Sequence, residues 1–252
     1  MIKENIEKML VFDVWSDYAH FRKIYTTTSP LTFSIPPRTA LCGLFGAIIG
    51  LEKENNEYLN YFTLDRAKTG LKILNPIKKV RISENIIHTK NAKGIGMNLI
   101  TERTQINFEF LKNPKYRIYL WHNDDELYGA LKKYLSEHKP VYTPCLGLSE
   151  NIANFKFVGE FDTYLRKHNS SILIHSIIPT QKLVDDQGVE IASEMEYFSE
   201  RIPVEMDTKR IVTKYSDILF ERNGKPIKAK MKESYLEVNY NDGTKENIVF
   251  IE

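Results

Sequence analysis

The chain has 252 residues, 42% of them hydrophobic and 27% charged, which is the composition of a soluble globular protein with one or two domains. The longest apolar run, residues 40–51, is too short to span a bilayer, and the first residues lack the apolar core of a signal peptide. Cys42 and Cys145 are too few for a disulfide framework or a zinc site, so we expect a cytoplasmic protein.

The net charge of +2 is the sum of segments of opposite sign. Residues 77–117 contain nine Lys or Arg against three Asp or Glu, whereas residues 123–205 contain eight against fourteen. A concentrated basic segment favours a polyanionic partner, and the acidic remainder disfavours nonspecific coating by nucleic acid. Chance segregation of charges on solvated faces explains this uneven distribution of charge equally well.

The first predicted elements are a strand and a buried helix. Residues 9–15 are β-branched and aromatic, which is typical of a buried strand. After a polar loop, a Pro-Pro pair opens a helix over residues 37–50 that is apolar on every side and ends at a glycine. Arg38 and Thr39 fall in its first turn, where free backbone N–H groups can receive an anion such as phosphate. The alternative is a core helix with a solvated arginine.

The next segment predicts a long basic hairpin. Residues 76–82 and 104–111 have strand-like composition, and the second stretch alternates apolar and polar side chains with the period of a strand. A tip with two glycines lies between them, so we expect a hairpin over about residues 77–111.

Further along, the sequence predicts a strand at 116–121, an amphipathic helix starting near Asn123 and a strand at 156–161. The order strand, helix, two strands, helix, strand approximates the ferredoxin-like unit, with the hairpin inserted. We therefore expect an α+β fold, with a ferredoxin-like domain over residues 1–165. Residues 166–252 are expected to form a small β-rich C-terminal region, because turn signals there separate short apolar runs.

Four stretches, in a fixed order, carry a resemblance to a known family. They are residues 12–22, the segment Ser34-Ile-Pro-Pro-Arg-Thr-Ala-Leu-Cys-Gly-Leu-Phe-Gly-Ala-Ile-Ile-Gly50, residues 103–119, and Tyr142-Thr-Pro-Cys-Leu-Gly-Leu-Ser-Glu150. Together they resemble the CRISPR RAMP family, and within it the crRNA 5′-handle-binding subunit of type I Cascade in its type I-B-like branch. The similarity spans most of residues 9–161.

The resemblance implies an RRM-like RAMP fold and a subunit that works in prokaryotic antiviral defence. Such a subunit binds the 5′ handle of crRNA, caps one end of Cascade, and contacts the neighbouring backbone subunit and the large subunit. It implies no membrane, no small-molecule substrate and no cofactor.

The residues expected to hold RNA fall into three groups. Phosphates would be bound by cations and N–H groups near the helix start and by cations along the hairpin, and bases would stack on aromatic rings. Core packing is an equal alternative for each ring. The candidates are Arg22, Lys23, Arg38 and Thr39 near the helix; Lys78, Lys79, Arg81, Lys90, Lys93 and Arg103 on the hairpin; and Tyr18, Phe21, Tyr25 and Tyr142 for stacking.

A catalytic role is the main alternative. The sequence has no metal-ligand spacing and no nucleotide-binding loop, so we expect neither a metal nor a cofactor. RNA cleavage without a metal could use His20 or His122 as acid or base and Tyr25 to orient the 2′-hydroxyl. In the related type I-C branch, the subunit cuts the CRISPR repeat with a Tyr and an adjacent Lys-His pair. Here Trp121 precedes His122, and this departure argues against cleavage. A stand-alone single-stranded RNA-binding module is the second alternative.

Overall fold

The central element of the fold is strand β1 (Lys8–Trp15), which is buried on both faces. The computed structural model describes residues 6–26, 28–87, 103–184 and 188–252. Leu10, Phe12 and Val14 face one hydrophobic core, whereas Met9 and Val11 face a second core on the other side of the sheet. A strand covered on both faces needs the nearly continuous apolar run seen in the sequence.

Strand β1 lies inside a six-stranded antiparallel sheet with the order β14-β13-β7-β1-β6-β3. In the register, Phe12 lies opposite Ile118 of β6 and Phe157 of β7, and a bulge shifts the β1–β7 pairing between Val11 and Phe12. The bounds of the other five strands are β3 Ala67–Ile73, β6 Lys115–His122, β7 Asn154–Arg166, β13 Tyr235–Asn239 and β14 Lys245–Ile248.

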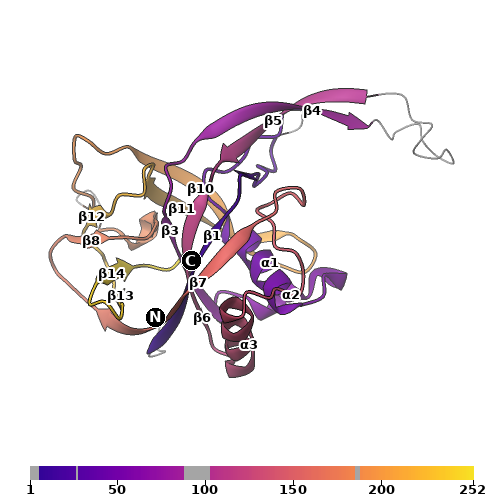
Figure 1. Ribbon diagram of the computed structural model, residues 1–252. Helices are drawn as coiled ribbons and strands as arrows, with labels where there is room; N and C mark the ends of the chain where they lie inside the picture. Colours follow the sequence, from indigo (N-terminus) through magenta and orange to yellow (C-terminus); the bar gives the residue numbers. More distant parts are fainter. Residues whose placement is uncertain (1–5, 27, 88–102, 185–187) are drawn as a thin grey trace.

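The helices pack against one face of this sheet (Figure 1). Helix α1 (Arg38–Ile49) follows Pro37 and ends at Gly50, whose φ of 81° is left-handed, which confirms the predicted helix and its C-terminal signal. Helix α3 (Asp125–Ser136) begins at the N-cap Asp124, whose side chain accepts from two backbone N–H groups, in agreement with the predicted acidic start. The short elements η1 (Glu54–Asn56) and α2 (Tyr58–Tyr61) complete the layer.

The C-terminal third shares the core and the main sheet with the rest of the chain. Ile202 and Val204 of β10 belong to the same buried cluster as Phe12, and β13 extends the main sheet beside β7. The sheet and its core therefore run across residue 165, the expected boundary. The remaining elements are β8 Ile172–Ile174, β9 Ile178–Pro179, η3 Thr180–Lys182, β10 Tyr197–Met206, β11 Val212–Glu221 and β12 Ile227–Ala229.

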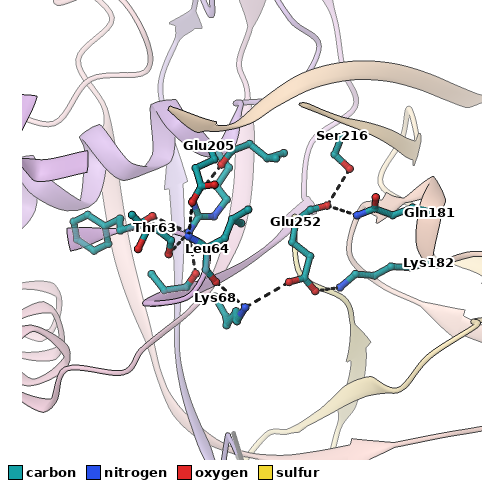
Figure 2. Close-up of polar contacts among 12 residues, drawn as sticks. Thr63, Leu64, Lys68, Gln181, Lys182, Glu205, Ser216 and Glu252 are labelled. Atoms are coloured by element: carbon teal, nitrogen blue, oxygen red, sulfur yellow. Dashed lines mark hydrogen bonds and ion pairs between the residues drawn. The ribbon is translucent and has the colours of Figure 1, made fainter. Parts of the chain in front are cut away.

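Glu252 joins three of these elements to one another (Figure 2). Its carboxylate pairs with Lys68 of β3 at 3.5 Å and with Lys182 of η3, and its carbonyl accepts from Gln181 and from Ser216 of β11. Burial alone would raise the pKa of this carboxyl, but Lys182 and Lys68 hold the pKa below its ordinary value. The ionised group therefore fastens the C-terminal strands to β3.

Strands β4 (Lys79–Ile87) and β5 (Arg103–Lys112) pair antiparallel and extend away from the main sheet (Figure 1). The two-residue strand β2 (Tyr18–Ala19) pairs with the inner end of β5. One face of the pair carries Val80, Ile82 and their cross-strand partners, and the other carries mostly polar side chains, with Leu111 and Ile87 at its two ends. This alternation is the pattern seen in the sequence.

Arg38 corrects the expectation of a phosphate ligand at the start of α1. Its side chain is buried, with the residue 1% exposed, and its guanidinium points into the protein. One terminal nitrogen donates to the carbonyls of Phe62 (2.8 Å), Thr63 (3.1 Å) and Ala67 (2.8 Å), and the other donates to the carbonyl of Val204 (3.2 Å). The reason is geometric, because the chain between α2 and β3 turns its carbonyls toward the helix and only a planar, multiply donating cation satisfies them together.

We predict that Arg38→Ala lowers the free energy of unfolding by about 3 kcal/mol or more, because it leaves buried carbonyls without donors. Arg38→Lys should recover only part of this loss, since an ammonium cannot span the carbonyls. Urea unfolding measures both.

Arg66→Ala is the matched control. Arg66 also donates to a carbonyl, that of Asn60, and pairs with Asp124, but its side chain is 34% exposed. We expect a loss below about 1 kcal/mol for this variant. Equal losses at the two arginines would contradict the structural role assigned to Arg38.

Candidate functional site

A groove of about 230 Å³ opens beside the start of α1. Its walls come from the segment after β2, from Pro37, Thr39 and Ala40 of the helix start, and from the facing ends of β10 and β11. Most of the lining is apolar or aromatic, and the exceptions include two arginines. The side chains that matter for the chemistry are Phe33, Tyr58, Tyr215, Met206, Arg22 and Arg210.

One wall is a narrow loop, residues 21–26 and 28–33, here called the groove loop. Phe33 donates its N–H to the carbonyl of Phe21 at 2.8 Å, and Lys23 donates its own to Leu31 at 2.8 Å, so the two arms pair like short strands. The outer part of the loop presents Ile24 and Tyr25, which are each 71% exposed. Large apolar side chains exposed beside a groove are typical of a binding surface.

Two carboxylates hold the groove loop in place. Glu109 of β5 accepts from the N–H of Thr32 (3.3 Å) and pairs with Lys79 (3.2 Å). Glu200 of β10 accepts from the N–H of Ser34 (2.7 Å) and pairs with Lys23 (2.5 Å). Burial would lower the pKa of Lys23, but Glu200 raises it above its ordinary value. Two of the predicted phosphate ligands, Lys23 and Lys79, therefore already have anionic partners.

Other cations at the site have no carboxylate within ion-pair distance among the residues that the structure describes. Arg22 is exposed and donates only to the carbonyl of Thr26 at 3.2 Å. Arg210, on the turn between β10 and β11, is also exposed. The same holds for Lys78, just before β4, and for Arg81 on β4. These side chains can bind an anion without first breaking an ion pair.

His20 lies under the groove with its tautomer fixed. It is 1% exposed, its Nδ1–H donates to the carbonyl of Glu109 at 2.7 Å, and its ring contacts Phe108 and Phe110. Burial lowers the pKa of His20, so the ring is neutral and Nε2 carries a lone pair. Within the described chain that Nε2 is buried without a hydrogen-bond partner.

His122 occupies a different environment from His20. It is buried at the end of β6, its Nε2–H donates to the carbonyl of Tyr61 at 2.7 Å, and its Nδ1 accepts from the N–H of Asp124 at 3.0 Å. Burial lowers the pKa of this histidine as well. Both ring nitrogens serve to join α2 to the start of α3. The three residues of the cleavage hypothesis thus have separate contacts, with Tyr25 exposed on the groove loop.

The remaining predicted residues divide between core and surface. Phe21 is 5% exposed and belongs to the main core, although it also lines the groove, so its ring serves mainly in core packing. Thr39 lines the groove, whereas Tyr18 packs against Phe110 and Tyr142 lies beyond the end of α1, both partly exposed. Arg103 is exposed at the start of β5. Lys90 and Lys93 lie outside the described residues.

The sequence analysis did not predict that the β10–β11 hairpin would form part of the groove. Residues 171–220 contain many charged side chains between short apolar runs, which obscured two ten-residue strands. The available signal was Asp207, whose side chain accepts from the N–H of Ile211 at 2.8 Å, a turn pattern that asparagine and aspartate favour. Reading that turn would have placed Arg210 and Tyr215 on one hairpin.

The described part of the chain contains no cluster of three or more His, Cys, Asp or Glu that could hold a metal ion. Among the same residues, no helix combines the length and apolar character needed to cross a membrane.

A family model and solved structures resemble this chain. The model described as CRISPR-associated protein (Cas_Cas5) matches residues 9–169, well over half of the chain. A chain of a CRISPR RNA-guided surveillance complex aligns with a TM-score of 0.52 at 12% identity, covering 89% of this chain and 91% of that one. A CRISPR protein from Archaeoglobus fulgidus aligns with a TM-score of 0.49 at 14% identity, covering 97% and 100%. No curated protein matches.

At these identities the first alignment shows a shared fold. That fold is a mixed one, with few helices and a curled antiparallel sheet, as in the surveillance-complex chain. The family match covers β1 through β7 and therefore includes α1, the groove loop and the β4–β5 pair.

We predict that Gly147→Ala lowers the free energy of unfolding of the protein by more than about 1 kcal/mol. Gly147 has a φ of +95°, and an added Cβ would lie 1.8 Å from the carbonyl oxygen of His20 beside the groove. Gly129→Ala is the control, since Gly129 lies on α3 with nothing within 4 Å of the added Cβ. It should gain about 0.5–1 kcal/mol. Urea unfolding of both variants decides the point, and a neutral effect at Gly147 would refute it.

The histidines predict a loss of stability on acidification. Burial lowers the pKa of His20, His122 and His175 below the ordinary 6.5, so below that pH the unfolded chain binds more protons than the folded one. Stability should therefore be complete above about pH 6.5 and fall as the pH drops below it. Urea unfolding between about pH 7.5 and 5.5 tests this. His122→Asn should reduce this pH dependence.

Proposed function

The chain belongs to the CRISPR-associated protein family Cas5, and from this we propose that it is an RNA-binding subunit of a CRISPR effector complex. In this proposal it holds the 5′ handle of crRNA and caps the complex of a type I-B-like Cascade. Its protein partners are the neighbouring backbone subunit and the large subunit. The chain binds the RNA without cutting it.

The order of elements supports a ferredoxin-like core for this subunit. Elements β1, α1, β3, β6, α3 and β7 follow one another as strand, helix, two strands, helix and strand, apart from short elements and the β4–β5 pair. Their strands lie in the order β7-β1-β6-β3 within one antiparallel sheet. We assign these elements to a ferredoxin-like unit, in which β4–β5 is an insertion between β3 and β6.

The observation that carries the RNA-binding role is the surface around the groove. Exposed Arg22 and Arg210, which have no carboxylate partner in the described chain, lie beside exposed Tyr25 and Tyr215. Single-stranded RNA is bound in this way, because cations hold its phosphates while unstacked bases pack on aromatic rings. The β4–β5 pair adds Lys78, Arg81 and Arg103 to the basic surface.

The placement of the histidines supports binding rather than cleavage. A general acid or base needs a ring nitrogen that can exchange a proton with the substrate. Both nitrogens of His122 are engaged with backbone groups, which leaves His20 as the one histidine of the cleavage hypothesis with an unpartnered ring nitrogen in the described chain. A single such nitrogen does not supply the acid and base pair that the hypothesis requires. We therefore propose that a separate nuclease matures the crRNA.

The direct test is to purify the tagged chain from its own host and to sequence the RNA and identify the proteins that accompany it. We expect crRNAs that share one repeat-derived 5′ end, together with a backbone subunit and a large subunit. Binding of this RNA should weaken with salt at a log–log slope of roughly −2 if about three phosphates are neutralised.

Incubation with the repeat RNA in EDTA provides the counter-test. Uncut RNA agrees with the proposal, whereas cleavage that disappears in Tyr25→Phe or His20→Gln would establish the endoribonuclease alternative. Tight RNA binding without any partner protein in the host would instead favour the stand-alone module.

A further inference from the structure

We infer that the groove between the groove loop and the β10–β11 hairpin holds one unstacked base of single-stranded RNA, with a neighbouring phosphate between Arg22 and Arg210. This inference rests on the proposed function and makes the groove its base-binding position. Four features of the described residues support it: the size, the lining, the charge and an unpartnered buried nitrogen.

The size and lining of the groove suit one planar base. Its volume of about 230 Å³ is smaller than the roughly 300–1,000 Å³ of pockets that take drug-sized ligands. Tyr58, Tyr215, Phe33 and Met206 supply aromatic and polarisable walls. Every base has a flat π face, so such walls accept a base that has left its stack.

The charge at the mouth of the groove suits a phosphate. Arg22 and Arg210 come from two different elements, the groove loop and the turn between β10 and β11, and the positive end of the α1 dipole adds to them because Pro37 and Thr39 line the same space. The nearby carboxylates of Glu109 and Glu200 are already paired with lysines and backbone N–H groups. Asp207, close to Arg210 in sequence, accepts from the N–H of Ile211. The two guanidinium groups therefore remain available to an anion.

His20 supplies a group that an inserted base can satisfy. It lines the groove, it is 1% exposed, and its Nε2 has no partner in the described chain. The Nδ1–H bond to Glu109 fixes the tautomer, so Nε2 can only accept. A buried acceptor without a donor is costly, and each of the bases carries an N–H on its pairing edge. Insertion of that edge would complete the environment of His20.

The experiment uses the full chain and short single-stranded oligouridylate and oligoadenylate, measured by fluorescence anisotropy. Tyr215→Ala should weaken binding by roughly five- to a hundredfold, the scale of one base–aromatic stack. Arg210→Gln should weaken it and reduce the salt slope. Tyr164→Ala is the matched control, because Tyr164 is 45% exposed and stacks with Arg166 at 5.3 Å, much as Tyr215 stacks with Arg201 at 5.6 Å. It should bind as the parent does.

The position of the base is measured separately by photocrosslinking an oligouridylate that contains one 4-thiouridine. Crosslinks on peptides that contain Tyr215 or Tyr58 support the inference. Suppose instead that Tyr215→Ala and Arg210→Gln bind as the parent does and the crosslinks lie on β4–β5. The groove inference is then wrong, while the proposed RNA-binding function stands.

Two further outcomes also overturn the inference. In the first, neither oligonucleotide binds to the parent chain. In the second, the groove of the copurified complex crosslinks to a peptide segment of another subunit. The absence of any RNA in the copurification would overturn the proposed function as well. Circular dichroism melts of each variant establish that it is folded.

Discussion

The buried guanidinium of Arg38 is the contact on which the arrangement of the helical layer depends. It joins α1 to the chain between α2 and β3 and to β10, elements that are far apart in sequence. No ion pair joins it to a carboxylate among the described residues, and its hydrogen bonds go to four carbonyl oxygens and to the Sγ of Cys42. A cation held in this way stabilises only one placement of those carbonyls, because small displacements leave donors and acceptors unpaired.

That placement determines which side of α1 faces solvent. With Arg38 directed inward, Thr39 and Ala40 are the first-turn residues that line the groove. Cations for a ligand must then come from neighbouring elements, and Arg22 and Arg210 are in the position to supply them. The helix start therefore contributes a wall and a dipole to the site, and the charged contacts belong to the segments packed around it.

The sequence was sufficient to predict the elements whose patterns are local. Residues 9–15 and 37–50 were identified by composition and by terminal signals, and both predictions are confirmed. The direction of Arg38 could not be read in this way, since an arginine after a Pro-Pro pair has the same local sequence whether it faces carbonyls or water. The carbonyls that decide it belong to residues 62–67 and Val204. The pairing of β10 with β11 was hidden for a related reason, because cross-strand contacts leave little trace in a charged sequence.

Glu109 uses three of its groups to hold the groove loop, His20 just before that loop, and Lys79 of β4. Its backbone N–H donates to Pro30 at 3.0 Å, its carbonyl accepts from His20, and its carboxylate binds Thr32 and Lys79. Because Glu109 also belongs to β5, the extended strand pair and the groove loop are mechanically one unit at this point. Any ligand that shifts one must do work on the other, and thermodynamic reciprocity makes that coupling equal in both directions. If a ligand at either surface shifts Glu109, its binding is linked to binding at the other surface.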